Sequence, residues 1–501
     1  MTEIELKFQV PAESRAAVAA SVAGRAGAGQ VQRLQAAYHD TAERALANAG
    51  VALRLRREGP RWVQTLKASG GDAMTRLEHN VERPGRAAAA PPLDLALHAG
   101  TPAGARLAEV LSGAADPVLA CQFRTDIRRL SRRMRTHGAV VELAFDTGRV
   151  QADAQVQPLC ELEIELLRGT PGALLACARQ WVSRHGLWLD TRSKAERGDL
   201  LTRGLPYTPA RKAVAVRLTA GMPAVAAQRA VLQACAQQVL PNASQVASGT
   251  FGDEHVHQLR VGLRRLRAAI ALFDGATDSD SEATPLAAAS AALFRELGAA
   301  RDQAAIGAQL RAQLEQAISA AGLALVAPSL PQGTGADPAR ALRSAAAQAL
   351  LLDLLDSTLP TLAAQDAAED PSLTALLAVR LERWHRQVKR DVRTFADLDD
   401  AARHRLRKRV KRLRYALEFT QALFGRKKVA RYLRVLSDLQ DRLGALNDVG
   451  VAITAFRSAP SADAALAFAL GWLVARREAL ATACAPALDG FARARRPWKC
   501  P

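Results

Sequence analysis

Aromatic residues and cysteines are both scarce in this chain. Aromatic residues make up only 4% of the 501 residues, which favours helices over a large β-sandwich. The cysteines are scattered and contain no CxxC pair, which excludes the usual spacing of a zinc site and the disulfide framework of a small secreted domain. They are Cys121, Cys160, Cys177, Cys235, Cys484 and Cys500.

Long apolar runs are absent as well. The longest one, residues 465–475, is too short to span a bilayer and is followed by Arg476 and Arg477, so it is better interpreted as a buried core helix. The N-terminus begins directly with charged residues in place of a signal peptide. The sequence therefore predicts a cytoplasmic protein with no membrane-spanning segment.

Acidic residues are few compared with basic ones. The chain has 68 Lys and Arg against 49 Asp and Glu, which gives a formal net charge of +19. Such an excess predicts an anionic partner: a nucleic acid, a membrane surface or a phosphate polymer. Because 501 residues exceed what one hydrophobic core usually serves, two or three domains are expected.

The two halves of the chain have different residue patterns. In residues 1–204, short runs of alternating polar and apolar residues are separated by Gly and Pro, which predicts an antiparallel sheet or barrel with helices outside it. Residues 205–218 begin with two closely spaced prolines and are typical of a linker. Helical periodicity dominates residues 219–501, so the expected fold class is α+β.

Charged residues alternate with apolar ones along the predicted strands, so that each strand has one charged face. The carboxylates gather on some faces and the cations on others. The carboxylate-rich faces contain Glu3, Glu5 and Lys7 in one strand and Glu161, Glu163 and Glu165 in another. The cationic faces contain Arg54, Arg56, Lys67, Arg124 and Arg128.

Two interpretations of these charged faces are open. Antiparallel sheets commonly expose one polar face to water, which accounts for the alternation without any site. However, three glutamates at every second position of a strand repel one another unless cations bridge them. Hard divalent cations such as Mg²⁺ prefer oxygen ligands, and Arg and Lys bind phosphate oxygens. A closed sheet with this lining would form a cavity for metal ions and phosphates.

Residues 1–200 also contain an ordered set of motifs that resembles the CYTH superfamily, the triphosphate tunnel metalloenzymes. The motifs are ExExK at 3–7, YHDT at 38–41, LRLR at 53–56, TLK at 65–67, RLEHNVE at 76–82, FRTDIRR at 123–129, VELAFDTG at 141–148, CELEIELLRG at 160–169 and SKAERG at 193–198. His39 stands where this family often has a second aromatic residue. The resemblance implies an eight-stranded antiparallel tunnel that hydrolyses a triphosphate with the help of a metal ion.

The same resemblance implies roles for individual residues. The metal ion, Mg²⁺ or Mn²⁺, would be held by Glu3, Glu5, Glu163 and Glu165. Glu5 and Lys7 would be catalytic. The substrate phosphates would be bound by Lys7, Arg54, Arg56, Lys67, Arg124 and Arg128. Alternation pairs Arg124 with Arg128 but does not fix which face of that strand lines the tunnel.

The helical half repeats itself. HQLRVGLRRLRAAIALF starts at His257 and HRLRKRVKRLRYALEF at His404, and LGAARD at 297–302 is answered by LGALND at 443–448. Because both pairs have nearly the same offset, they predict a duplicated unit of two pseudo-symmetric helical bundles. One repeat would occupy about residues 219–327 and the other about residues 339–490.

Each repeat contains a ladder of cations headed by a histidine, in which steps of three and four residues place the side chains on one helical stripe. The ladders are His257, Arg260, Arg264 and Arg267, and His404, Arg407, Lys411 and Arg414. A solvated basic face is the ordinary explanation of such a pattern. Dense like charge nevertheless destabilises a helix, and its duplication favours a polyanion site. Because the ladders contain no aromatic side chains to stack on bases, a phosphate chain fits them better than a nucleic acid does.

These helices resemble the CHAD domain, a conserved-histidine α-helical domain, over roughly residues 220–490. The resemblance implies binding of inorganic polyphosphate and recruitment to polyphosphate granules. The chain is therefore expected to be an inorganic triphosphatase with a polyphosphate-binding module and no membrane partner. A non-catalytic granule-binding scaffold, a cyclase acting on ATP, a thiamine triphosphatase and a nucleic-acid-binding helical half remain open alternatives.

Overall fold

The computed structural model describes residues 2–24, 28–83, 90–274, 284–330, 337–360, 372–458 and 463–499. The chain divides into two compact units, each composed of several segments. The first contains 1–212, 236–259 and 338–359, and the second contains 213–235, 260–337 and 360–501. Segments of the helical half thus belong to the first unit. The ranges 1–204, 205–218 and 219–501, inferred above as domains and linker, stay predictions.

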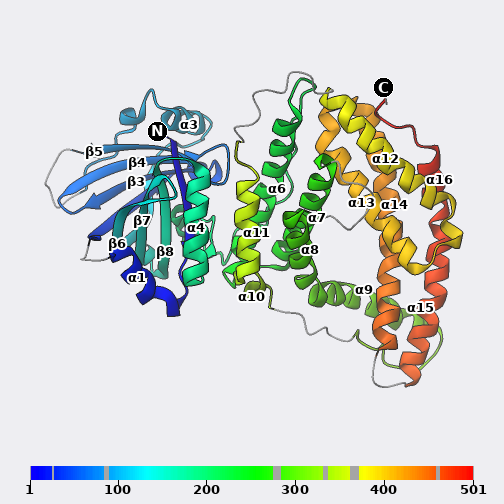
Figure 1. Cartoon of the computed structure of the whole chain (residues 1–501). Helices are drawn as coiled ribbons and strands as arrows, with labels where there is room; N and C mark the ends of the chain where they lie inside the picture. The colour runs from blue at the N-terminus through cyan, green and yellow to red at the C-terminus, as the bar shows by residue number, and fades with distance from the viewer. Residues whose placement is uncertain are drawn as a thin grey trace. The chain divides into compact units, whose positions relative to one another are not determined.

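Eight antiparallel strands of the first unit close into a barrel (Figure 1). Their order around the ring is β5-β4-β3-β2-β6-β7-β8-β1, and the pairing of β1 with β5 closes it. The predicted eight-stranded antiparallel tunnel is therefore confirmed, with a two-residue strand, β9 (Trp188–Leu189), added beside β1. The eight strands are β1 (Thr2–Gln9), β2 (Gln30–Asp40), β3 (Val51–Glu58), β4 (Arg61–Ser69), β5 (Thr75–Arg83), β6 (Ala120–Thr136), β7 (Ala139–Ala152) and β8 (Gln155–Arg168).

Ion pairs across intervening strands show which face of the barrel points inward. Lys67 on β4 pairs with Glu3 on β1 although β5 lies between the two strands. Likewise, Arg129 on β6 pairs with Glu163 on β8 across β7. Such pairs form only on the concave side of a closed sheet. The strand faces that contain Glu3, Lys67, Arg129 and Glu163 therefore line the tunnel, while apolar residues such as Phe8 are buried on the outside.

Helices cover much of the outer wall. α1 (Arg15–Ala23) packs on β6 and β7, and α4 (Pro171–His185) packs on β7 and β8. α2 (Ala45–Asn48) and α3 (Pro102–Ser112) bury a core over β3 and β4. Both α3 and α4 begin with a threonine N-cap followed by proline, a combination that starts a helix at a defined residue.

One helix, α5 (Lys194–Thr202), lies inside the barrel. It starts with a capping box formed by Ser193 and Glu196. It packs against buried residues of the inner face: Leu34, Ala36, Tyr38, Phe123, Ile127, Val150, Ala152 and Leu159. A Cβ atom at Gly198 would lie 2.1 Å from the ring of Phe123, so glycine allows this close approach. The apolar contact plugs this part of the tunnel.

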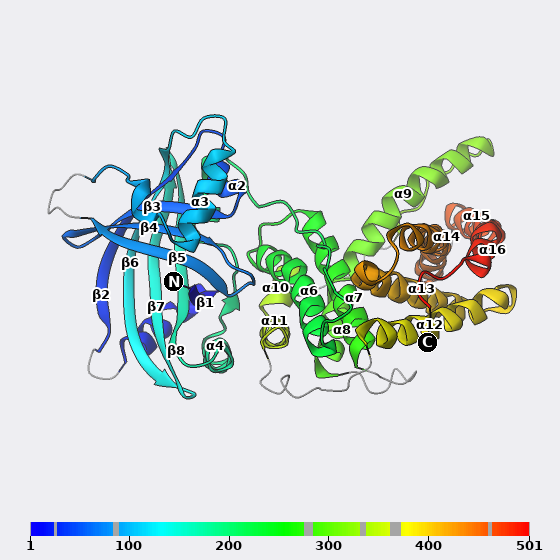
Figure 2. The ribbon, with the colours of Figure 1, turned by 90° about the horizontal axis from the view of Figure 1, so that it is seen from above.

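The rest of the described chain is helical, as predicted, and Figure 2 gives a second view of it. α7 and α13 contain the two histidine-headed ladders and are both 21 residues long, and each begins at an aspartate of the repeat, Asp253 and Asp400. No helix in these described ranges is long and apolar enough to cross a membrane. The helices are α6 (Ala224–Ala247), α7 (Asp253–Phe273), α8 (Pro285–Glu296), α9 (Ala299–Ala320), α10 (Pro338–Arg343), α11 (Ala345–Asp356), α12 (Leu373–Arg393), α13 (Asp400–Thr420), α14 (Arg426–Arg457), α15 (Ala464–Ala483) and α16 (Ala485–Arg493).

A buried polar cluster joins α12, α14 and the C-terminal segment within the second unit. Nδ1 of His385 lies 2.6 Å from the hydroxyl oxygen of Tyr432. The indole N–H of Trp498 donates to Glu382 at 3.1 Å, and Arg496 also pairs with that carboxylate. Burial lowers the pKa of His385 to about 4, so this imidazole is neutral at pH 7.

We expect this histidine to make stability depend on pH. Its pKa is lower in the folded chain than the ordinary value of 6.5, so its contribution is complete above pH 6.5 and is lost as pH falls towards 4. The upper bound of the loss is about 3 kcal/mol at 1.36 kcal/mol per pKa unit, and solvent screening reduces it. Urea midpoints of the native chain and of His385→Gln, measured from pH 7.5 to 4.5, should diverge, with the variant less sensitive to acid. Parallel curves would contradict this assignment.

Candidate active site

A row of three carboxylates crosses three neighbouring strands inside the barrel. Glu142 on β7 lies opposite Glu165 on β8, which in turn lies opposite Glu5 on β1. Like charges directly opposite one another destabilise a sheet. Among the described residues, neither Glu5 nor Glu165 has an ion-pair partner within 4 Å, whereas Glu142 reaches Arg133 at 3.1 Å. The row is therefore a concentration of negative charge that the fold leaves largely uncompensated.

Glu3 and Glu78 extend this acidic region towards β5. Nζ of Lys67 lies 2.7 Å from Glu3 and 2.8 Å from Glu78. Burial and a hydrogen bond with Glu78 raise the pKa of Glu3 to about 9. Burial alone would lower the pKa of Lys67, but the charges of Glu5, Glu3 and Glu78 outweigh it and raise this pKa.

Glu165 responds to the same surplus of charge. Burial, together with the neighbouring carboxylates of Glu142, Glu78 and Glu5, raises its pKa to about 7. A pKa raised this far means that nearby cations do not fully compensate the charged form of the carboxyl group. Hard oxygen donors in this arrangement suit a divalent ion such as Mg²⁺ or Mn²⁺. The residues present therefore fit a metal ion.

A second acidic group lies deeper, next to α5. The carboxylates of Asp146, Glu161 and Glu163 lie within 4.8 Å of one another. Nζ of Lys194 contacts all three, at 2.8, 2.6 and 2.8 Å, and Arg129 forms a bidentate pair with Asp146. Despite burial, these cations hold the pKa values of Asp146 and Glu163 below their usual range. This group is neutralised by side chains, so a metal ion there would have to displace Lys194.

Cations with buried side chains line the tunnel near these carboxylates. Lys7 is only 9% exposed and its charge lowers the pKa of Glu163. Arg54 donates to the hydroxyl of Tyr38 at 3.1 Å. Burial and the nearby charge of Arg54 lower the pKa of Arg56 to about 10. Two arginines this close in a buried wall repel each other, which an anionic ligand would relieve.

The structure divides the predicted metal ligands between the two acidic groups. It brings Glu3, Glu5 and Glu165 together but places Glu163 beside Lys194. It places four of the predicted phosphate-binding residues on the tunnel lining, and their roles remain proposals. These four are Lys7, Arg54, Arg56 and Lys67.

Two of the predicted substrate-binding residues lie outside the tunnel. Arg124 and Arg128 are exposed, on the face of β6 opposite to Arg129. Alternation placed the two on one face of this strand without fixing which face lines the tunnel, and their face is the outer one. Because Arg129 pairs with Asp146 and Glu163 within the barrel, it is the arginine of this strand that reaches the site.

Several residues that line the tunnel were given no role in metal or phosphate binding from the sequence: Glu78, Arg129, Glu142, Asp146, Glu161 and Lys194. Most of them lie on strands whose alternation was recognised, so the missing information was the register between strands. Lys194 has a different origin, since it projects from a helix that enters the barrel. Its only sequence signal is the SKAERG motif at 193–198.

The ladder residues of α7 from Arg260 onward and those of α13 form a second charged site within the second unit, and His257 belongs to the first unit. Burial and the charges of Arg407 and Arg264 lower the pKa of Lys411 to about 7, which places cations of both helices near one another. The guanidinium groups of Arg260 and Arg264 stack over the ring of Phe294, at 4.7 and 5.4 Å from its centroid.

The remaining ladder residues differ in exposure. His257, Arg267 and His404 are exposed, and Nδ1 of His404 lies 2.7 Å from the side-chain oxygen of Asn447. Arg414 pairs with Glu418 at 3.1 Å. A concentration of cations is a suitable surface for a polyanion.

Comparisons with known proteins agree with both halves of this description. Residues 1–198 match the family model of the CYTH domain and residues 230–457 that of the CHAD domain. An inorganic triphosphatase from Haemophilus influenzae is 28% identical over 173 residues, which are 33% of this chain and 44% of that protein. This chain thus spans less than half the length of that relative.

Two solved structures are similar to parts of the chain. The CHAD domain of the plant Ricinus communis has 28% identity and a TM-score of 0.42, and covers 58% of this chain and 98% of its own. A putative adenylyl cyclase from Hippeastrum, described as having a dominant triphosphatase activity, has 17% identity and a TM-score of 0.29. It covers 41% of this chain and 98% of its own.

Proposed function

Because the chain carries a CYTH domain at residues 1–198 followed by a CHAD domain at residues 230–457, we propose that it hydrolyses inorganic triphosphate in the barrel and binds inorganic polyphosphate through α7 and α13. The observation that supports hydrolysis most directly is the row of Glu142, Glu165 and Glu5 in the same lumen as a set of buried cations. One group suits a divalent ion and the other suits phosphate oxygens.

Glu3, Glu5 and Glu165 would hold the metal, Mg²⁺ or Mn²⁺, with Glu142 and Glu78 beside them. When bound, such an ion neutralises phosphate charge and lowers the pKa of a water molecule. Phosphoryl transfer requires little covalent chemistry from the protein. The chain therefore has to position the reactants and compensate their charge.

The cations of the tunnel supply that positioning. Arg54, Arg56 and Lys67 would bind oxygens along the triphosphate, and their places on β3 and β4 spread them over neighbouring strands. Lys7 lies on β1 directly opposite Glu163 and two residues from Glu5 of the acidic row. Its proposed role is to orient the attacking water molecule for in-line attack on the terminal phosphorus. The apolar plug of α5 excludes bulk water from one side of the site.

The polyphosphate assignment rests on α7 and α13. Burial and the nearby charges of Arg407, Arg264 and Arg414 lower the pKa of Lys411 to about 7, so these ladder cations lie close to one another. Burying several cations together is costly unless an anion compensates them. The exposed ladder residues, such as Arg267, extend the same surface to solvent.

We expect metal-dependent release of phosphate from tripolyphosphate, faster than from ATP, thiamine triphosphate or long-chain polyphosphate. The measurement compares these four substrates with Mg²⁺, with Mn²⁺ and with EDTA, which should abolish turnover. Preferred cleavage of ATP or thiamine triphosphate would replace the proposed substrate. Cleavage of none of them, with polyphosphate still bound, would favour a non-catalytic scaffold.

A further inference from the structure

Four arginines that do not line the tunnel share the outer face of β2, β6 and β7. Arg33 lies opposite Arg128, and Arg149 lies opposite Asp126, which stands between Arg124 and Arg128 on β6. All four arginines are exposed. We call this group the outer arginine patch: Arg33, Arg124, Arg128 and Arg149.

The patch contains more positive charge than its surroundings compensate. Arg33 forms a bidentate pair with Asp126, at 2.9 and 2.8 Å, and Arg149 reaches the same carboxylate at 3.8 Å. Among the described residues, the guanidinium groups of Arg124 and Arg128 have no ion-pair partner within 4 Å. Asp126 is thus the one described carboxylate paired within this group of four cations. In addition, Arg33 lies directly opposite Arg128, and like charges in that position destabilise a sheet.

The helices that pack on the outer wall contact it elsewhere. α1 lies further along β6, where Arg132 donates to the backbone oxygen of Ser21 at 3.0 Å. α4 packs on β7 and β8. The patch is therefore a sheet surface open to solvent.

We propose that the outer arginine patch binds a linear inorganic phosphate polymer, as a site separate from the tunnel and from the ladders of α7 and α13. Guanidinium groups bind phosphate oxygens in a bidentate manner, and Asp126 holds one of them in place. Arg124 and Arg128 are four positions apart on an extended strand, so their Cα atoms are about 13 Å apart. The patch therefore suits an extended chain better than a single phosphate ion.

The neighbouring side chains distinguish this polymer from other polyanions. Across the strands, Gln35, Ala37, Thr147 and Gln151 share the same face, and His39 adjoins it, where burial and the charge of Arg124 lower its pKa. One half-buried imidazole is a poor substitute for the stacking aromatic side chains on which single-stranded nucleic acids bind. The identity of the polymer rests on the proposed function, but the surplus of cations on this face does not.

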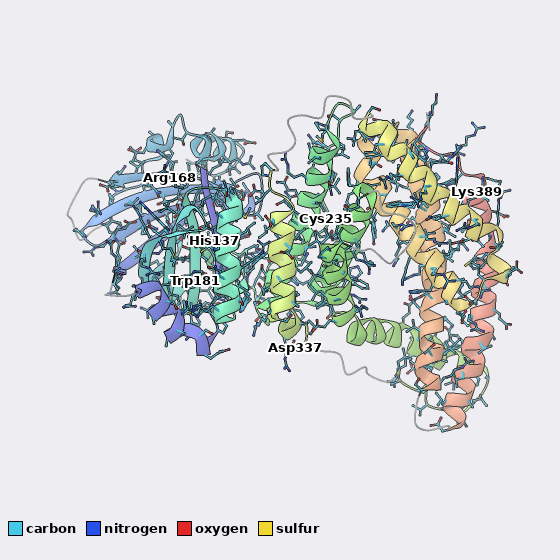
Figure 3. All side chains as sticks on the ribbon, in the orientation of Figure 1. His137, Arg168, Trp181, Cys235, Asp337 and Lys389 are labelled. Carbon is cyan, nitrogen blue, oxygen red and sulfur yellow. The ribbon has the colours of Figure 1, made fainter. Side chains whose placement is uncertain are left out.

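The test uses the full chain with Arg407→Glu, Lys411→Glu and Arg414→Glu, so that the ladder of α13 no longer contributes. In this background, Arg124→Glu with Arg128→Glu is compared with a matched control, Arg106→Glu with Arg168→Glu. The control residues are also exposed, lie elsewhere on the barrel unit and give the same change of net charge (Arg168 is labelled in Figure 3). Labelled long-chain polyphosphate, oligothymidylate and phosphatidylserine vesicles are the three probes.

We expect the patch variant to bind polyphosphate about tenfold or more weakly than the control, with a salt slope lower by about 2. The same pair of variants in the otherwise native chain gives the same comparison if the triple background does not fold. Equal losses in patch and control variants, or none, would overturn the inference. A larger loss for oligothymidylate or vesicles than for polyphosphate would overturn the choice of polymer.

Failure of the proposed function is a separate result. Hydrolysis of tripolyphosphate should be unchanged by Arg124→Glu with Arg128→Glu, because these residues lie outside the tunnel. A chain that hydrolyses no triphosphate but shows patch-dependent binding of polyphosphate would support the patch and reject the triphosphatase.

Discussion

Glu5→Gln is expected to lower metal-dependent phosphate release from tripolyphosphate by about 100-fold or more. Even the outer partners of a metal ligand are typically worth about 10–100-fold, and Glu5 is a proposed ligand. The amide keeps the size of the side chain but removes its charge from the row with Glu142 and Glu165. Because the row is repulsive without a metal ion, the variant should unfold at the same temperature or a higher one. Phosphate release and thermal unfolding are measured together.

The matched control is Glu82→Gln, the same change at an exposed glutamate of β5 that pairs with Arg61. It should leave turnover within about twofold, since exposed pairs contribute little. A Glu5 variant that retains activity would remove Glu5 from the site. A variant that loses both activity and stability would show instead that Glu5 supports the fold.

Simultaneous reversal of charge at Arg407, Lys411 and Arg414 is expected to weaken binding of long-chain polyphosphate by about 100-fold or more at low salt. These three cations and Arg264 lie near one another, so their field acts on one stretch of polymer. The slope of affinity against salt concentration should fall as well, because fewer counterions are released from the polymer. Titration of the labelled polymer at several salt concentrations measures both effects.

A control with the same change of net charge reverses three exposed cations outside the ladder: Arg405, Lys408 and Lys427. It should lose far less affinity. Because reversed charge next to Glu418 strains α13, Lys411→Met is a second variant that keeps the helix. Methionine costs less to bury than an ammonium group, so this variant should be more stable and should still bind polymer more weakly. Unchanged affinity in both variants would place the polyphosphate site elsewhere.

Alternation along single strands predicted an antiparallel sheet or barrel and part of its lining, whereas the closed eight-stranded tunnel was implied by the family resemblance. In β1, the period of two separates Lys7 from Phe8, and the structure follows it. The same period could not tell the faces of β6 apart, because both carry arginines. Only pairing with β7 places Arg129 opposite Asp146 and leaves Arg128 outside. Register between distant strands is a property of the closed sheet, and a single strand does not contain it.

The helical half shows a similar limit. Steps of three and four residues place Leu406, Val410 and Leu413 on a stripe of α13 beside the ladder, and these three side chains are buried. The ladder was treated as one uniform stripe, but Lys411 is sufficiently desolvated to change its pKa whereas His404 is exposed. Helical periodicity gives the direction of a side chain but not what the neighbouring helices place against it.

The apolar plug of α5 has a consequence for the order in which a phosphate chain would be shortened. Gly198 lets this helix press on Phe123, so apolar side chains fill the barrel next to α5, whereas Glu5 and Glu165 lie outside this apolar cluster. For the proposed hydrolysis, we expect a lumen filled on one side to admit a linear phosphate by its end. Cleavage would then start at a terminus, and a cyclic phosphate, which has no end to insert, would be a poor substrate.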